Sequence, residues 1–340
     1  MKKTMIGASV AAACLLPLTA AAGTTLYGEL SYSFNSVDED REFNPDGSTG
    51  QDGLSGNDNV SLFGLKGSYG DDIKAFFHLQ TGAKADPGGA FDQRFFFGGL
   101  EGDFGKVAYG RMTNAYKFPG FKMDPFYNLS HIGAGGGFAA GAGTYGLSPA
   151  TDGFTDNALQ YTTPSLAGFK LLGGVYVDDS NEDDHGYSAG ISYDGVEGLN
   201  VGAVFASNDD TGTIPNIAAD GDALRGYANY EVDIFTFGLS YENVDLAAAD
   251  TDANYLYATG TVAIPNANTD ISLSIGNVDD GPAEGLGFTA GAFYNITENT
   301  DIHAIYSLAS LDADDQYPAS DSEPEVISLG FTHKFSLSSN

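Results

Sequence analysis

From Gly23 to the end of the sequence, apolar and polar residues alternate in segments of about ten residues, and each segment ends at a turn or loop signal. In residues 235–242, aromatic and aliphatic side chains share one face, while Thr, Gly, Ser and Glu share the other. Residues 187–194 and 271–276 repeat this pattern. Such alternation indicates strands with one apolar face, which occur both in soluble β-sandwiches and in membrane β-barrels.

The lengths of the connections distinguish these two architectures. Eight long polar connections alternate with seven short ones, which gives sixteen strands. Bacterial membrane barrels place short turns on the periplasmic side and long loops outside, whereas a sandwich has no reason for strict alternation. The long connections lie near 36–58, 82–92, 112–156, 178–186, 207–223, 244–253, 277–285 and 311–325, and the short ones near 70–71, 102–103, 164–165, 194–195, 231–233, 265–266 and 298–299. The sequence therefore predicts an all-β, 16-stranded antiparallel transmembrane barrel.

The first 22 residues have the three parts of a secretory signal peptide. Lys2 and Lys3 precede a short apolar stretch that Pro17 interrupts, and small residues stand before Gly23. A membrane anchor is the alternative, but this stretch is shorter than the roughly 20 residues of a spanning helix. We therefore expect a signal peptide over residues 1–22 and a barrel over residues 23–340.

The charge of the chain narrows the choice of partners. Removal of Lys2 and Lys3 leaves 12 basic residues against 46 acidic ones, a formal charge of −34. A chain this acidic is a poor ligand for phosphate backbones, so nucleic-acid binding is excluded. The 46 glycines, 19 tyrosines and 23 phenylalanines fit a barrel better than a soluble globular enzyme.

Four short motifs, in their order along the chain, resemble the general diffusion porins of Gram-negative bacteria. Residues 25–28 (TLYG) and 61–67 (SLFGLKG) are similar to the first two strands of that family. Residues 95–111 (FFFGGLEGDFGKVAYGR) are the most specific match, and residues 156–161 (DNALQY) resemble the strand after the constriction loop. Family members commonly end on the aromatic residue of the last strand, whereas five residues follow Phe335 here.

The resemblance implies a location, a partner and a loop. It implies an outer-membrane homotrimer, surrounded by lipid and lipopolysaccharide, through which ions and small hydrophilic solutes diffuse passively without a cofactor. It also implies that the third loop, about residues 112–155, folds into the lumen and narrows it, because a sixteen-stranded barrel alone encloses a wide channel. In this family, acids on that loop face basic residues across the lumen.

The candidate basic residues of the constriction are Lys66, Arg94 and Arg111. Lys66 alternates with Phe63 and Leu65 and is expected to line the lumen, whereas the pattern does not fix the face of Arg94. Strict alternation would place Arg111 on the lipid face, so the sequence predicts a strand end or a β-bulge there. Some positions where family members often carry an arginine hold Leu62, Gln160 and Thr162.

The candidate acids of the constriction are Asp124, Asp152 and Asp156, and Lys117 and Lys122 flank Asp124 and are expected to pair with it. Solvated loop surface is the alternative for each acid. Acids on the loop facing a depleted basic wall would favour cations. The sequence thus predicts a cation-preferring pore.

One alternative stays open at this stage, and two others are not expected. A channel with a preference for a sugar or an organic cation would show an aromatic track, and the loop is rich in phenylalanine. An enzyme is not expected, because adjacent Ser130 and His131 are the nearest approach to a catalytic pair and no supporting acid is apparent. A metal site is not expected either, because the acidic run 178–184 lacks the spacing of a calcium loop.

Overall fold

The structure is a computed structural model. It describes residues 23–38, 53–83, 91–129, 145–178, 184–210, 212–247, 251–281, 284–312 and 323–338. The expected signal peptide, residues 1–22, and the Ser130–His131 pair lie outside the described residues. The described part of the chain contains no helix long and apolar enough to cross a bilayer.

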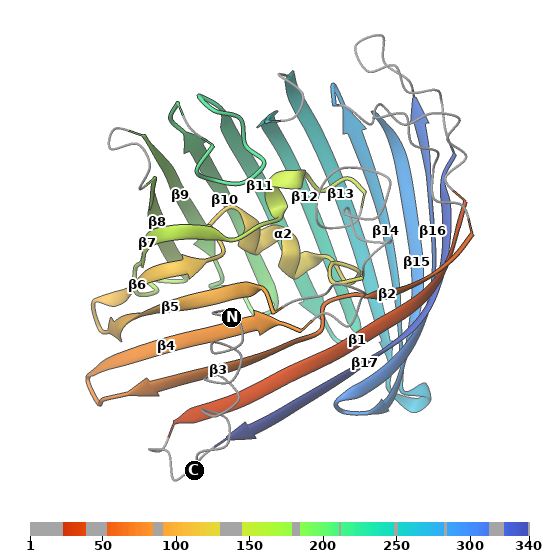
Figure 1. Cartoon of the computed structure of the whole chain (residues 1–340), viewed down its shortest axis with the longest axis horizontal. Coiled ribbons are helices and arrows are strands. Elements are labelled where there is room, and N and C mark those ends of the chain that lie inside the picture. Colours follow the sequence, from red (N-terminus) through yellow and green to blue (C-terminus); the bar gives the residue numbers. More distant parts are fainter. Residues whose placement is uncertain are drawn as a thin grey trace, which may run out of the picture.

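The described strands form one sheet in which every pair of neighbouring strands is antiparallel (Figure 1). They are β1 (Thr24–Asp38), β2 (Gly53–Asp58), β3 (Leu62–Tyr69), β4 (Ile73–Gly82), β5 (Gln93–Gly102), β6 (Gly105–Met112), β7 (Thr155–Thr162), β8 (Phe169–Val177), β9 (His185–Tyr193), β10 (Leu199–Asn208), β11 (Asp222–Val232), β12 (Phe235–Leu246), β13 (Thr251–Ile264), β14 (Thr269–Asp279), β15 (Glu284–Thr297), β16 (Thr300–Asp312) and β17 (Glu325–Ser338).

The sheet closes on itself because the first strand pairs with the last one. β1 pairs with β17 along almost its whole length, from Thr25 opposite Ser338 to Asp38 opposite Glu325. On its other edge, β1 pairs with β3 near its start and with β2 near its end. β2 and β3 therefore share one position in the wall, and the seventeen described strands occupy sixteen positions. The predicted sixteen-stranded barrel is confirmed.

The seven short turns all lie where the sequence placed them, for example at 103–104 between β5 and β6 and at 233–234 between β11 and β12. One expectation was wrong, because residues 53–58 were placed in a long loop and instead form β2. Pairing with residues 32–37 of β1 gives this polar segment backbone partners. A short interruption follows, in which the Asn59 backbone N–H donates to the Ser31 carbonyl over 2.9 Å.

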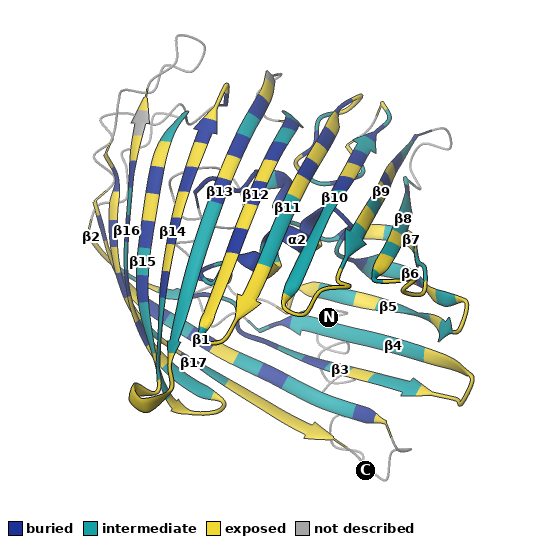
Figure 2. Ribbon diagram, turned by 180° about the vertical axis from the view of Figure 1, so that it is seen from behind, coloured by how far each residue is buried: buried dark blue, intermediate teal, exposed yellow. Residues whose placement is uncertain are grey.

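The barrel has a polar inner face and an apolar outer face. Along β14, Ser272 and Ser274 are buried, whereas the intervening Leu273 and Ile275 are each 48% exposed. The same alternation of buried and exposed residues runs along the neighbouring strands (Figure 2). A soluble sandwich would bury its apolar face, so this reversed arrangement fits lipid outside and water inside.

The described parts of the connection between β6 and β7 lie inside the barrel (Figure 1). These parts include the short helix α2 (Lys117–Met123) and the 3-10 turn η1 (Pro149–Thr151). Another 3-10 turn, η2 (Pro265–Ala267), lies outside this loop, between β13 and β14. Both α2 and η1 contact β12 from inside. This placement confirms the predicted folding of the third loop into the lumen.

Two adjacent residues of β7 test the assignment of the two faces. Leu159 is 47% exposed on the outer face, and Gln160 points inward opposite Ala108. We expect Leu159→Arg to lower the free energy of unfolding by about 2–4 kcal/mol, because the charge enters lipid near the middle of a strand. Gln160→Arg should cost only about 1 kcal/mol, the value of its hydrogen bond to the Thr113 carbonyl. Urea unfolding in lipid vesicles measures both, and equal costs would contradict the assignment.

Candidate functional site

An ion pair on the inner face of β11 and β12 lies against the inserted loop. Arg225 and Glu242 stand directly opposite each other in strand register, and Nη2 of the arginine lies 2.6 Å from Oε2 of the glutamate. Both side chains point inward because the outward positions beside them hold exposed Leu224 and Tyr241. Both are fully buried. A buried charge is strongly destabilising without partners, so this pair requires further hydrogen bonds.

The loop supplies those hydrogen bonds from both of its ends. The Tyr116 hydroxyl donates to Glu242 over 2.8 Å, and the Ser148 backbone N–H donates to the same carboxylate over 3.1 Å. Arg225 donates to the Tyr116 carbonyl over 2.7 Å and to the Thr151 hydroxyl. Tyr116 precedes α2 and Ser148 precedes η1, so one wall pair fixes both limbs of the loop. We call Arg225 and Glu242 the clamp.

A close backbone approach adds a second point of attachment, on β14. A Cβ atom on Gly276 would stand 1.8 Å from the Tyr145 carbonyl oxygen. Gly146, with φ of +98°, lies against the same glycine. Only glycine leaves room for this contact, which brings the returning limb of the loop against the wall.

Asp124 also attaches the loop to the wall. Its Oδ1 accepts hydrogen bonds from the Tyr257 hydroxyl of β13 over 2.8 Å and from the Phe126 backbone N–H over 2.9 Å. The side chain is buried, with 6% exposure. The sequence suggested Asp124 as the acid that faces the open lumen, whereas the structure places it between loop and wall.

Three cations surround the ring of Phe154, where the loop returns to β7. The Nζ atom of Lys117 and the guanidinium carbons of Arg94 and Arg111 lie 4.8, 4.9 and 5.5 Å from the ring centroid. The negative face of an aromatic ring attracts cations at such distances. The structure thus brings together three basic residues that the sequence had selected separately.

The two remaining candidate acids are each paired with one of these cations. Arg111 Nη1 lies 2.7 Å from Asp156 Oδ2, and Lys117 Nζ lies 3.3 Å from Asp152 Oδ1. Lys117, which was expected to pair with Asp124, thus forms its ion pair with Asp152. Lys122 is exposed and lies 4.8 Å from the ring centroid of Phe118.

Arg111 reaches its position through a break in the strand register. The pairing of β6 with β7 shifts between Gly110 and Met112, and Gly110 has φ of +132°. The predicted irregularity at Arg111 is confirmed, because without it the side chain would share the lipid face with Tyr109.

Burial lowers the pKa of the Lys117 ammonium, and the neighbouring Asp152 carboxylate raises it in part. The ammonium also donates to the Gly153 carbonyl over 3.1 Å. Desolvation disfavours the charged form of a lysine, so these two acceptors are what keeps the charge on a side chain that is only 5% exposed.

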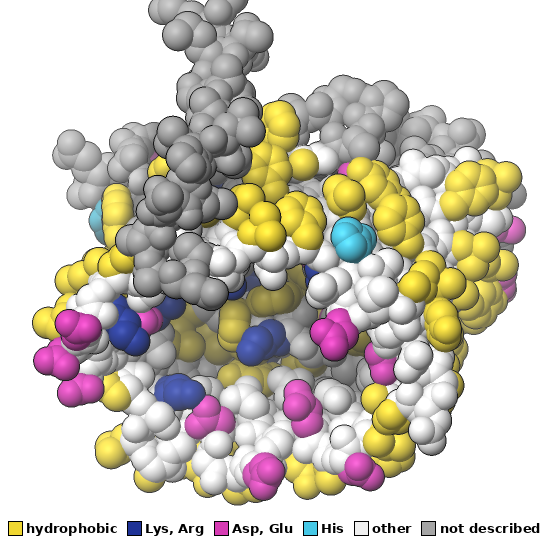
Figure 3. Space-filling model, turned by 90° about the horizontal axis from the view of Figure 1, so that it is seen from below, with side chains coloured by type: hydrophobic (Ala, Val, Ile, Leu, Met, Phe, Trp, Pro, Cys, Tyr) yellow, Lys and Arg dark blue, Asp and Glu magenta, His cyan; other side chains and the backbone are white. Residues whose placement is uncertain are grey.

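Lys66 and Arg94 extend the basic surface along β3 and β5. Arg94 donates to Gln80 over 2.9 Å, and Gln80 donates to the Tyr27 hydroxyl over 2.9 Å. Lys66 lies 5.3 Å from the centroid of the Tyr27 ring. Neither cation forms an ion pair with an acid among the described residues. The space-filling view from below shows lysine and arginine side chains inside the hollow of the barrel (Figure 3).

Neither clamp residue is among the candidates predicted from the sequence, although a usable signal is present. The turn at 231–233 was predicted correctly, and the observed hairpin pairs Val232 with Phe235. Extending that register places Arg225 opposite Glu242 on the polar face. Opposite charges facing each other on neighbouring strands would have indicated the pair.

One described group of carboxylates is close enough to share a cation. Oxygen atoms of Asp279, Asp280 and Glu284 lie within 4.8 Å of one another at the connection between β14 and β15. The two aspartates are exposed, and exposed acids commonly stand together without a metal. We assign no metal or cofactor to them.

A closed barrel with an apolar exterior, a polar interior and an inserted, clamped loop defines the class of channel-forming membrane β-barrels. The profile of the Gram-negative porin family matches residues 8–336, and the chain belongs to this family.

Three known proteins show the extent of the likeness. An outer membrane porin protein of Bordetella pertussis is 26% identical over 379 aligned positions, covering 100% of this chain and 92% of that protein. The anion-selective porin from Comamonas acidovorans superposes with a TM-score of 0.70 at 17% identity, covering 93% of this chain and 100% of that one. The trimer form of OmpT from Vibrio cholerae has a TM-score of 0.64 at 15% identity, covering 93% and 100%. At these identities the two solved structures support the fold alone.

The clamp gives a test of how the loop is held. Glu242→Ala leaves Arg225 charged and buried, so we expect the free energy of unfolding to fall by about 3–5 kcal/mol. Single-channel current should also become noisier, because the hydrogen bonds of Glu242 no longer hold the two limbs of the loop against the wall. In the control, Arg225→Met combined with Glu242→Met removes both charges and should cost less. A double variant at least as unstable as Glu242→Ala would contradict a charge-based clamp.

Proposed function

We propose that this protein forms a water-filled channel across the outer membrane, through which ions and small hydrophilic solutes diffuse passively. The observation that carries the proposal is the reversed barrel, apolar outside and polar inside, with a loop fixed across its lumen by the clamp. Lipid and lipopolysaccharide are the expected surroundings of the apolar exterior. Membership of the Gram-negative porin family supports the same activity.

We further propose that the constriction lies between the inserted loop and the wall formed by β3, β5 and β6. The basic residues Lys66, Arg94, Arg111, Lys117 and Lys122 and the acids Asp152 and Asp156 belong to this region. The contacts around Phe154 support this assignment, because they join residues of the loop to residues of the wall.

The described charges favour anions at this constriction, in contrast to the cation preference expected from the sequence. That expectation combined acids on the loop with a depleted basic wall, but Asp124 is buried, and Asp152 and Asp156, although exposed, are each paired with a cation. Lys66 and Arg94 add positive charge and form no ion pair among the described residues, although Asp92, Asp152 and Glu29 lie close enough to act electrostatically on Arg94. The anion-selective porin from Comamonas acidovorans shows that the fold accommodates this preference.

The remaining acidic residues of the chain oppose the effect of the constriction. Most of the formal charge of −34 after signal removal lies outside the constriction and attracts cations towards the barrel. Salt screens exposed charges over about 10 Å at 0.1 M and about 3 Å at 1 M. Anion preference should therefore be most evident at high salt.

A homotrimer is the proposed assembly, supported by the trimer form of OmpT from Vibrio cholerae, which shares the fold. A preference for a sugar or an organic cation is the alternative function. It is favoured by rings on the loop, where the centroids of Phe118 and Phe121 lie 5.4 Å apart and those of Phe121 and Tyr127 lie 5.6 Å apart. Concentration-dependent block of single channels by the solute would support that alternative.

Reversal potentials in a KCl gradient test the charge preference. At about 1 M salt we expect chloride to be more permeant than potassium. Lys66→Gln and Arg94→Gln should each reduce the ratio of chloride to potassium permeability about twofold, because salt at this concentration screens charges that are more than about 3 Å from the permeating ion. Lys74→Gln, which removes a charge near the short-turn end of β4, is the control and should change the ratio less. Potassium preference at high salt, or an equal effect of all three variants, would refute the proposed charge map.

A further inference from the structure

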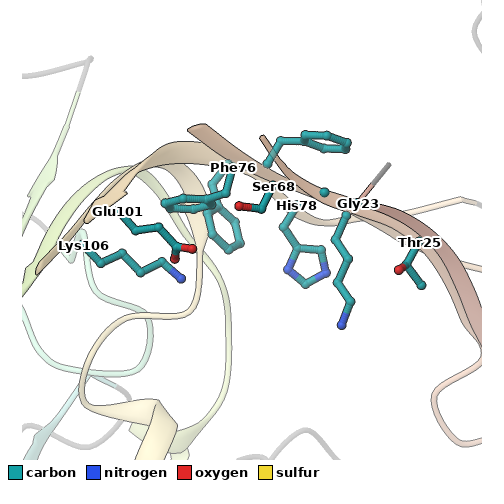
Figure 4. Close-up of a pocket in the computed structure, with 11 residues that line it drawn as sticks. Gly23, Thr25, Ser68, Phe76, His78, Glu101 and Lys106 are labelled. Atoms are coloured by element: carbon teal, nitrogen blue, oxygen red, sulfur yellow. The ribbon is translucent and has the colours of Figure 1, made fainter. Parts of the chain in front are cut away.

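A cavity of about 320 Å³ opens on the inner face of the barrel, and neither clamp residue lines it. Its lining comes from β1, β3, β4, β5 and β6, close to the short turns at 70–72 and 103–104. The labelled side chains of Phe76, His78, Glu101 and Lys106 project to the same side of the sheet (Figure 4). The volume lies within the range of about 300–1,000 Å³ that is usual for small-molecule sites.

Two ammonium groups and one carboxylate set the charge of this cavity. Lys66 and Lys106 both line it, and neither forms an ion pair among the described residues. Glu101 also lines it and stands directly opposite Lys106 in strand register. The formal charge of these three residues is +1, so the cavity suits a ligand with one negative charge better than one with two.

Aromatic rings form the apolar part of the cavity. Phe76 and Phe97 meet edge to face, with ring centroids 6.3 Å apart, and the Phe97 ring lies 5.4 Å from His78. Lys106 Nζ lies 4.4 Å from the Phe76 ring centroid, so a cation and an apolar surface are adjacent. A ligand that combines an anionic group with a flat apolar group would contact both surfaces.

We propose that this cavity is a binding site for small aromatic monocarboxylates. The ring of the ligand packs on Phe76 and Phe97, and its carboxylate lies between the ammonium groups of Lys66 and Lys106. Glu101 opposes the second charge of a dicarboxylate. This inference rests on the proposed channel function and makes passage of such anions saturable, whereas simple diffusion is not saturable.

The test uses single channels of the purified protein in a planar bilayer at about 1 M KCl. Benzoate is added to each side in turn, and acetate, benzyl alcohol and phthalate are the comparison solutes. We expect benzoate to block the current in a saturable manner. The concentration needed for block should be about tenfold lower for benzoate than for the other three solutes, because only benzoate combines one charge with a ring.

Variants then locate the effect. Lys66→Met, Lys106→Met and Phe76→Leu should each weaken benzoate block about fivefold. Lys334→Gln removes a lysine that does not line the cavity, and this variant should change benzoate block less than twofold. The KCl conductance of each variant without benzoate shows that it folds and opens.

Several results would overturn the inference. Equal block by acetate indicates a general anion site, and equal block by benzyl alcohol indicates apolar adsorption. A loss of block in Lys334→Gln equal to that in Lys66→Met indicates an effect of net charge only. Normal KCl conductance without benzoate block refutes the site while leaving the channel function intact. Absence of any conductance refutes the channel and the site together.

Discussion

A bilayer core offers no hydrogen-bond partner to a peptide group, and this constraint determines the architecture. The pairing of β1 with β17 removes the two free edges of the sheet, so the described strands share their backbone hydrogen bonds around a closed ring. Closure then divides every strand into a lipid face and a water face. The alternation of exposed Leu273 and Ile275 with buried Ser272 and Ser274 follows directly from it.

Closure produces a wide lumen, and the clamp holds the described limbs of the inserted loop against its wall. Tyr116, Ser148 and Thr151 of the loop supply hydrogen bonds that the buried ion pair of Arg225 and Glu242 needs. The loop and the wall therefore stabilise each other. The same arrangement brings the returning limb, with Phe154, against the cations of the opposite limb and of β5 and β6.

The strands, the short turns and the bulge at Arg111 could be predicted because alternation and turn residues are local signals. The constriction could not be predicted to the same extent. Whether Asp124 faces water or the wall depends on its contact with Tyr257, 133 residues away in the sequence. Residues 53–58 are polar, so the sequence pattern did not indicate that they pair with β1.

The proposed channel function requires an open aqueous passage that the clamped loop narrows. Swelling of liposomes that contain the purified protein tests it directly, with a series of uncharged sugars of increasing size. We expect fast swelling with monosaccharides and a steep decline towards larger oligosaccharides. Absence of swelling with every sugar, or a rate that does not depend on sugar size, would contradict it.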